Sequence, residues 1–120
     1  MNWENLYYDD KRLLSIFNFR RALIFLAYRQ GNQLICKAKG FSGVVTIMRW
    51  RLKDAARISA SLKVKRGKVR LFIVDGKEII PLLETDADQE SSQFFDPGKY
   101  RVRIAAIDAE FEAQVSTRFS

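Results

Sequence analysis

The sequence predicts a mainly β fold, an antiparallel β-sandwich of about seven strands, with a short helix near the amino terminus. Apolar and polar residues alternate over residues 57–74, on both sides of Arg66 and Gly67, as in a β-hairpin that buries one face. Turn signals also separate the apolar segments at intervals of roughly 8 to 12 residues. This spacing is typical of jelly-roll and immunoglobulin-like sandwiches.

The central hairpin is expected to turn at Arg66 and Gly67. A two-residue loop there places apolar residues opposite one another on the buried face, and basic residues opposite one another on the solvent face. The apolar pairs are Ala60 with Ile73, Leu62 with Leu71 and Val64 with Val69, and the basic pairs are Lys63 with Arg70 and Lys65 with Lys68.

Length and composition indicate one globular domain. The chain has 120 residues, of which 48% are hydrophobic and 29% charged, and neither a repeat nor a low-complexity linker interrupts it. We expect residues 1–21 to form an aromatic-rich lead-in and residues 22–120 to form the sandwich. The net charge is +7, with a basic excess in residues 41–70 and an acidic excess in residues 71–98.

Cysteine usage and the amino terminus favour a cytoplasmic location. Cys36 is the only cysteine and cannot form a disulfide within the chain, which favours a reducing compartment. The first residues carry acids and aromatics in place of the basic start and apolar core of a signal peptide. The apolar run of residues 22–27 is too short to span a bilayer.

The amino-terminal region contains a helix signal and several aromatic residues. Asp9 or Asp10 can cap a helix that starts at Lys11, because aspartate accepts hydrogen bonds from the first free amides. The aromatic residues are expected to pin this terminus onto the core, and stacking on a ligand is the alternative. They include Trp3, Tyr7, Tyr8 and Phe17.

Residues 22–39 fit either a helix that ends at Gly31 or a hairpin that turns at Gly31 and Asn32. The glycine-first order suits a type II′ turn, so we favour the hairpin. Cys36 then falls on the apolar side of the second strand, where a thiol is buried and inert.

Further strands are expected over residues 44–52, 77–83, 99–107 and 110–119. Trp50 aligns with apolar neighbours and is expected in the core, with a surface stacking platform as the alternative. Asp75 and Gly76 signal a turn, and Pro81 marks the strand after it as an edge strand. A final hairpin is expected to turn near Asp108 and Ala109, and its pairs are Val102 with Val115, Ile104 with Ala113 and Ala106 with Phe111.

Composition excludes several kinds of catalytic and metal site. The chain has no histidine, which removes histidine triads and histidine metal sites, and one cysteine cannot build a thiolate zinc site. Asp86, Asp88 and Glu90 alternate as in a calcium loop, but the turning glycine and the distal glutamate are missing. No phosphate-binding loop of the GxxxxGK kind occurs. We therefore predict no catalytic residues, no metal, no cofactor and no enzyme activity.

Three stretches resemble a known group of proteins. They are residues 41–43 (FSG), 58–78 (ISASLKVKRGKVRLFIVDGKE) and 97–106 (PGKYRVRIAA). This pattern is similar to that of small, uncharacterised bacterial β-sandwich proteins and covers roughly residues 40–118. The resemblance implies a sandwich but carries no catalytic motif and no assigned ligand, so no functional residue can be transferred. Some of these proteins look like lipoproteins, whereas this chain shows neither an export signal nor a lipid-attachment cysteine at its start.

We predict a non-catalytic β-sandwich interaction module whose partner the sequence does not identify. The alternative is binding of an anionic partner, such as nucleic acid, a polyanionic polymer or an acidic membrane surface, through a basic face. Basic residues on strands also guard against edge-to-edge aggregation, and edge strands offer a route to a homo-oligomer. The third possibility is a carbohydrate-binding module that uses Trp3, Trp50 or tyrosines. The candidate anion-binding residues are Lys63, Lys65, Arg66, Lys68, Arg70, Arg101 and Arg103.

Overall fold

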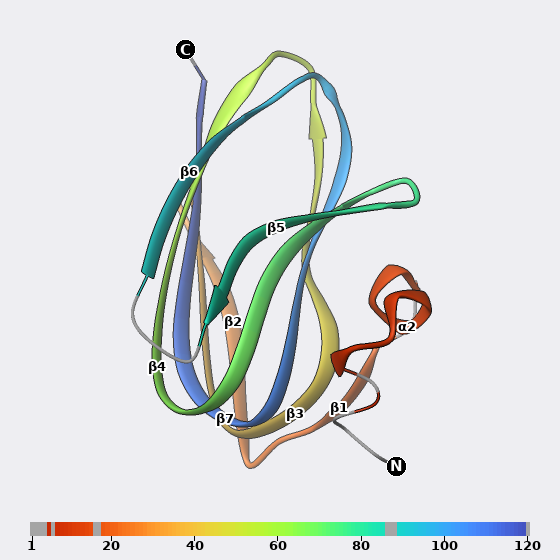
Figure 1. The fold of residues 1–120 in the computed structure, drawn as a ribbon. Helices are drawn as coiled ribbons and strands as arrows, with labels where there is room; N and C mark the ends of the chain where they lie inside the picture. The colour runs from red at the N-terminus through yellow and green to blue at the C-terminus, as the bar shows by residue number, and fades with distance from the viewer. Residues whose placement is uncertain (1–4, 6, 16–17, 86–88, 120) are drawn as a thin grey trace.

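The computed structural model describes residues 5, 7–15, 18–85 and 89–119, which form an antiparallel sheet of seven strands and one short helix (Figure 1). The predicted mainly β, antiparallel fold is therefore confirmed. The elements are α2 (Asp10–Leu14), β1 (Phe19–Arg21), β2 (Ile24–Gln30), β3 (Gln33–Leu52), β4 (Ala56–Asp75), β5 (Glu78–Thr85), β6 (Gln89–Phe95) and β7 (Gly98–Phe119).

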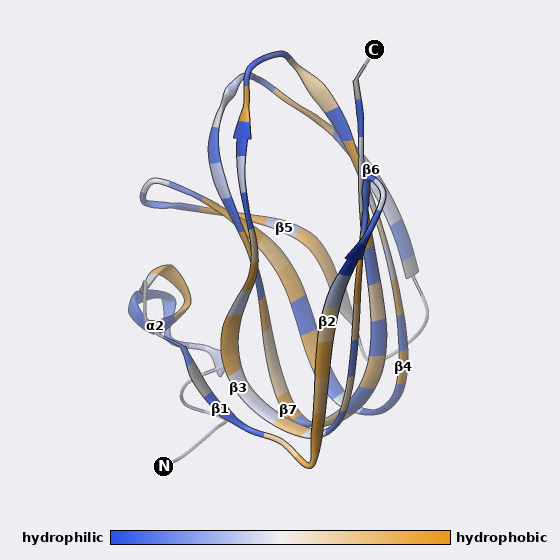
Figure 2. Cartoon of the chain, turned by 180° about the vertical axis from the view of Figure 1, so that it is seen from behind, coloured by the Kyte–Doolittle hydropathy of each residue, from blue (hydrophilic) through white to orange (hydrophobic). Residues whose placement is uncertain are grey.

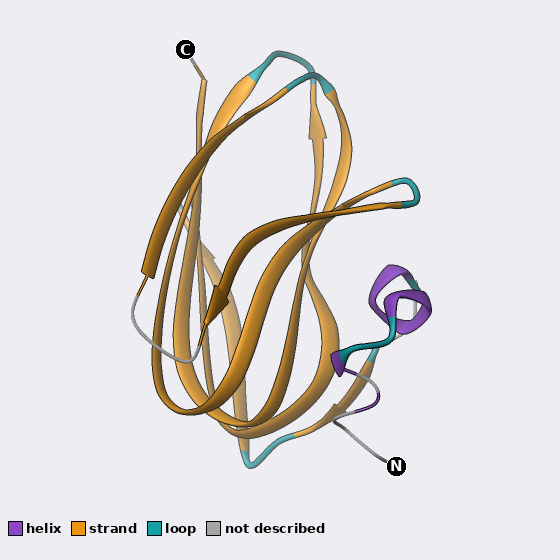
Figure 3. Cartoon of the chain, in the orientation of Figure 1, coloured by secondary structure: helices purple, strands orange, loops and turns teal. Residues whose placement is uncertain are grey.

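Three long strands bend sharply and so turn the continuous sheet into a sandwich. β3 and β4 have 20 residues each and β7 has 22, and all three curve at the same level (Figures 1 and 3). On one side of the bend the strands pair in the order β2-β3-β7-β4-β6, which we call the first half-sheet. On the other side the order is β1-β3-β7-β4-β5, the second half-sheet.

The predicted hairpin at Arg66 and Gly67 is wrong, because β4 runs through these residues as one strand. Its register against β7 shifts between Val64 and Lys68, so the strand bulges there and its inward-facing side changes from even to odd positions. A two-residue hairpin loop would also change the inward-facing positions from even to odd, so the sequence pattern fits both structures. Leu62 and Leu71 are both buried, as predicted, but they lie on the two arms of one bent strand.

The final hairpin predicted at Asp108 and Ala109 is wrong for the same reason. β7 is continuous, and Asp108 has a positive φ of 45° at the bend. The backbone N–H of Asp108 donates to the hydroxyl oxygen of Ser42 at 2.8 Å, which ties the bend of β7 to that of β3. Arg66 pairs with the Asp108 carboxylate at 3.0 Å, which adds an exposed tie to β4.

Two other hairpins are confirmed. Gln30 pairs with Gln33 across a loop that begins at Gly31, whose φ of 63° fits the glycine-first turn. β4 and β5 form a hairpin in which Asp75 pairs with Glu78, so its loop lies one residue later than the Asp75–Gly76 signal suggested. β5, which contains Pro81, lies at the edge of the sheet, as predicted.

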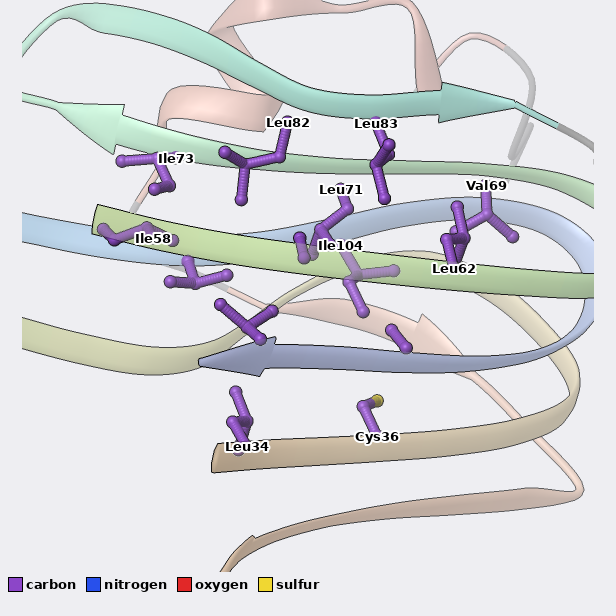
Figure 4. Close-up of a cluster of buried hydrophobic side chains, with 14 of the residues drawn as sticks. Leu34, Cys36, Ile58, Leu62, Val69, Leu71, Ile73, Leu82, Leu83 and Ile104 are labelled. Carbon is purple, nitrogen blue, oxygen red and sulfur yellow. The ribbon is translucent and has the colours of Figure 1, made fainter. Parts of the chain in front are cut away.

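The main core fills the space between the two half-sheets. Hydrophobic and hydrophilic residues alternate along parts of the long strands (Figure 2), and buried hydrophobic residues of β3, β4, β5 and β7 meet between the half-sheets (Figure 4). Cys36 and Trp50 belong to this core, as the sequence predicted. The largest residues at its centre are Phe41, Ile58, Leu62, Leu71, Ile73 and Ile104.

A smaller apolar cluster lies on the outer face of the second half-sheet, where α2 packs (Figure 1). Leu13 of α2 is fully buried there against a patch that includes Phe72, Val74 and Ala105. The side chain of Asp9 caps α2 by accepting from the backbone N–H of Lys11 at 3.0 Å, which confirms the predicted cap. Within the described residues, no helix is long and apolar enough to cross a membrane.

Candidate binding surfaces

The bend in β4 divides the predicted basic face. Lys63 belongs to the first half-sheet, Arg70 belongs to the second, and Arg66 and Lys68 lie at the bend between them. The predicted facing pairs of Lys63 with Arg70 and Lys65 with Lys68 are therefore wrong, since these residues follow one another along a single strand.

Lys63 and Lys65 lie among neighbours of both charges. The residue opposite Lys63 on β7 is Glu112, and both lysines line a small hollow together with Glu110 and Glu112 and with Lys37 and Lys39 of β3. Opposite charges facing each other across a strand pair are the usual, favourable arrangement. Glu112 thus offsets part of the charge of Lys63, and the hollow as a whole keeps a basic excess.

Arg101 and Arg103 lie under the amino-terminal segment, where they bind the last turn of α2. Arg101 donates to the carbonyl oxygens of Leu14 and Ser15 at 2.7 and 2.8 Å. Arg103 donates to those of Arg12 and Leu13 at 3.1 and 2.6 Å, and also to that of Ser15. The prediction of Arg103 as an anion-binding residue is wrong, because this side chain is fully buried.

The burial of Arg103 lowers its pKa. Desolvation, followed by the nearby charges of Arg101 and Arg49, lowers the pKa of Arg103 to about 10. The remaining predicted residue, Arg70, donates to the carbonyl oxygen of Tyr7 at 3.1 Å and lies over its ring. Arg70, Arg101 and Arg103 therefore all help to hold the amino-terminal segment on the sheet.

A different feature occupies the outer face of the first half-sheet. Polar side chains on β3, β4, β6 and β7, all but one of them uncharged, surround a hollow of about 470 Å³, which we call the polar hollow. Its lining consists of Gln33, Ser59, Ala60, Ser61, Glu90, Ser91, Ser92, Gln114 and Ser116.

The hollow forms because small serines occupy neighbouring outward positions. Ser59 pairs with Ser92 of β6 on one side and with Ser116 of β7 on the other. The hydroxyl groups of Ser59 and Ser92 are 3.3 Å apart, and the Gln33 side-chain amide donates to Gln114 at 2.8 Å. Hydroxyl and amide side chains offer both donors and acceptors, so the surface can hydrogen-bond a neutral polar ligand.

Exposed aromatic side chains occur on β6 and β2, outside the lining of the polar hollow. Phe94 of β6 is 62% exposed and lies beside Arg57, whose guanidinium is 4.3 Å from the centre of the ring. Arg57 also donates to the hydroxyl of Ser92 at 3.3 Å. On the opposite side of the half-sheet, Tyr28 of β2 is 39% exposed and pairs with Ile35.

Sequence reasoning missed this surface. The sequence pattern predicts no strand over residues 89–95, and without that strand the serines of β4 have no polar neighbours on that side. The available signal was the run of serine and glutamine at alternate positions in residues 89–93 and 114–116 of a chain that is 29% charged.

Other candidate residues lie elsewhere. Trp50 is 7% exposed and packs in the main core, which excludes a surface platform at that position. Trp3, Asp86 and Asp88 lie outside the described residues. Among the residues that the structure describes, no group of three or more Cys, Asp or Glu side chains could hold a metal ion.

Comparisons with known proteins identify no family. No protein-family model and no curated protein matches the chain. Among solved structures, similarity is found to family 29 carbohydrate binding modules. One is described only as such a module (11% identity, 85% of this chain and 76% of that chain, TM-score 0.41). Two are variants, one complexed with mannohexaose (15%, 84% and 79%, 0.41) and one complexed with cellulohexaose (11%, 85% and 78%, 0.41). Similarity at this level assigns no ligand to this chain.

Proposed function

We propose that the protein is a non-catalytic β-sandwich module that binds a neutral glycan in the polar hollow. The observation that carries this proposal is the combination of hydrogen-bonding side chains, most of them uncharged, with an exposed ring, Phe94, which Arg57 links to the lining residue Ser92. The volume of about 470 Å³ falls within the range of roughly 300–1,000 Å³ that is common for small-ligand sites.

A sugar has functional groups that complement those of this surface. Its hydroxyl groups both donate and accept, and they match serine hydroxyls and glutamine amides without requiring a charge. Its apolar ring face can cover the ring of Phe94, which would otherwise stay exposed to water. The guanidinium of Arg57 holds that ring from one side, so the platform is partly ordered before a ligand arrives.

The absence of a strong charge in the hollow distinguishes a glycan from a polyanion. Glu90 is the one ionisable residue in its described lining, and it would repel a phosphate or a sulfate. Binding through neutral hydrogen bonds and stacking should therefore change little with ionic strength, whereas binding of a polyanion weakens steeply as salt rises.

Substitution of Phe94 tests the proposal. The purified protein would be screened against soluble polysaccharides by affinity electrophoresis at low and high salt, and any retained glycan would be titrated calorimetrically. The Phe94→Ala variant should bind roughly tenfold more weakly, which corresponds to about 1.4 kcal/mol of lost stacking. The matched control is Tyr8→Ala, because Tyr8 is 59% exposed but lies on the amino-terminal segment, away from the hollow.

Three results are possible, and each leads to a different conclusion. Salt-insensitive retention that Phe94→Ala weakens and Tyr8→Ala leaves unchanged supports a glycan site at the polar hollow. Equal affinity in the wild type and in Phe94→Ala would remove the role of this surface. Retention that disappears at high salt would reassign the ligand to a polyanion.

A further inference from the structure

A second hollow, distinct from the polar hollow, lies on the outer side of the second half-sheet near the ends of β3 and β7. Its volume is about 540 Å³, and four basic side chains of these two strands line it, so we call it the basic hollow. They are Arg49, Arg51, Lys99 and Arg101. Sequence reasoning singled out only Arg101 of these four.

Like charges face each other directly in the basic hollow. Arg49 of β3 is opposite Arg101 of β7, and Arg51 is opposite Lys99. Like charges opposite one another across an antiparallel pair are unfavourable. Elsewhere on β7 both arrangements occur, because Glu112 faces Lys63 and Arg118 faces Arg57. The basic hollow differs in having two such like-charge pairs side by side.

No carboxylate forms an ion pair with these cations within the described part of the chain. The ion pairs found there join Arg12 to Asp9 and Arg66 to Asp108, and neither involves the basic hollow. Burial, followed by the charges of Asp75 and Asp96, raises the pKa of Tyr100, which also lines the hollow, so these two carboxylates lie nearby without pairing. The side chains of Arg49, Arg51 and Lys99 make no hydrogen bond to any described residue, and all three are exposed. Their donors remain available to a ligand.

Arg101 gives the basic hollow a fixed point. Its guanidinium is held by two hydrogen bonds to the carbonyl oxygens of Leu14 and Ser15, so its position is set by the end of α2. Burial and the charge of Arg49 lower the pKa of Arg101 below its ordinary value, which reflects the positive potential at this place. An anion would relieve that potential.

We propose that the basic hollow binds one phosphate or sulfate group of a phosphorylated or sulfated ligand. Four cations at adjacent positions of two paired strands surround a single compact site, and arginine guanidinium groups match tetrahedral oxyanions with paired donors. The cationic track does not continue toward the bend, because the next basic residue of β7 in that direction, Arg103, is buried under α2. A compact group therefore fits better than an extended polyanion.

This site is independent of the proposed glycan site. The polar hollow is built on the first half-sheet and the basic hollow on the second, and the two share no lining residue. Loss of either activity by substitution should leave the other intact, so the two proposals can fail separately.

Titration with simple anions tests the inference. Inorganic phosphate and sulfate would be titrated into the wild type and into an Arg49→Gln/Arg51→Gln double variant, with binding followed by calorimetry and by thermal stabilisation. The matched control is Lys63→Gln/Lys65→Gln, which also removes two positive charges, but from β4 and outside the basic hollow. We expect saturable binding that the arginine variant weakens roughly tenfold or more, since charge-assisted hydrogen bonds are lost, and that the lysine variant retains.

Three results would overturn the inference. The first is equal weakening of anion binding in both double variants, which would indicate general attraction to a basic protein. The second is the absence of saturable binding of either anion. The third is binding of an oligonucleotide under conditions in which neither phosphate nor sulfate binds. If the anions bind as expected, comparison of a sugar phosphate with a sugar sulfate identifies which ester the site prefers.

Discussion

Gly67 is the residue on which the bend of the sheet depends most directly. It lies in β4 with a φ of +81°, a conformation that residues with a β-carbon rarely adopt. A β-carbon built there would come within 2.4 Å of the carbonyl oxygens of both Ile107 and Asp108 on the neighbouring strand β7. Both contacts are with backbone, which cannot rotate away as a side chain can.

The Gly67→Ala variant should therefore be strongly destabilised. A non-glycine residue in a sparsely populated backbone region costs about 1–3 kcal/mol. Forcing extra volume into a packed site costs typically about 1–3 kcal/mol more. The sum is roughly 2–6 kcal/mol. At roughly 4 °C per kcal/mol for a domain of this size, the melting temperature should fall by about 8–24 °C.

Gly76→Ala is the matched control for this experiment. Gly76 also has a positive φ, +59°, but a β-carbon there meets nothing within 4 Å. Both variants carry the conformational cost, and only Gly67→Ala adds the steric one. Thermal melts followed by circular dichroism, with urea unfolding as a second measure, should show a clearly larger loss for Gly67→Ala. Equal losses would refute the close approach of β4 and β7 and would favour an open hairpin loop at Gly67.

Two further predictions concern the main core. The Leu62→Ala variant should lose about 2–5 kcal/mol in urea unfolding because Leu62 is fully buried, whereas Ser61→Ala on the outer face should change the free energy of unfolding by about 0.5 kcal/mol or less. A Leu62→Ala value as small as the serine value would contradict its burial. Burial also raises the pKa of the Cys36 thiol from 9.0 to about 12, so thiol reagents at pH 8 should label it only after unfolding. Between pH 9 and about 12 the thiol is protonated in the folded state and deprotonated in the unfolded state, so the free energy of unfolding should decrease as pH rises above about 9. The Cys36→Ala variant should lack this pH-dependent decrease. Rapid labelling of the folded protein would contradict this account.

Alternation in the sequence predicted the buried residues more reliably than the connections between strands. Leu62, Leu71, Ile104 and Ala113 are all buried as expected. Their burial follows from the phase of the apolar pattern, and that phase inverts in the same way at a two-residue loop and at a bulge. The pattern alone could not distinguish the two. Stronger turn signals, at Gly31 and after Asp75, led to correct hairpins.

The wrong predictions about the surface followed from the wrong predictions about how the strands are connected. Once residues 57–74 were folded as a hairpin, Lys63 and Arg70 had to share one face, whereas the bend places them on the outer sides of different half-sheets. The facing pair of Arg49 and Arg101 could not be anticipated, since it depends on the pairing of β3 with β7 over a separation of 52 residues. The polar hollow was missed because it needs four strands to be placed side by side.

The measurement that most directly tests the proposed glycan site is a map of backbone amide chemical shifts in the labelled protein during titration with the retained oligosaccharide. Binding in the polar hollow predicts that the largest shifts occur on the first half-sheet, at Ser59, Ser61, Ser92 and Gln114. The amides of Arg49 and Arg101 on the second half-sheet should change little. Shifts concentrated at the basic hollow, or an absence of localised shifts at saturating oligosaccharide, would contradict the account.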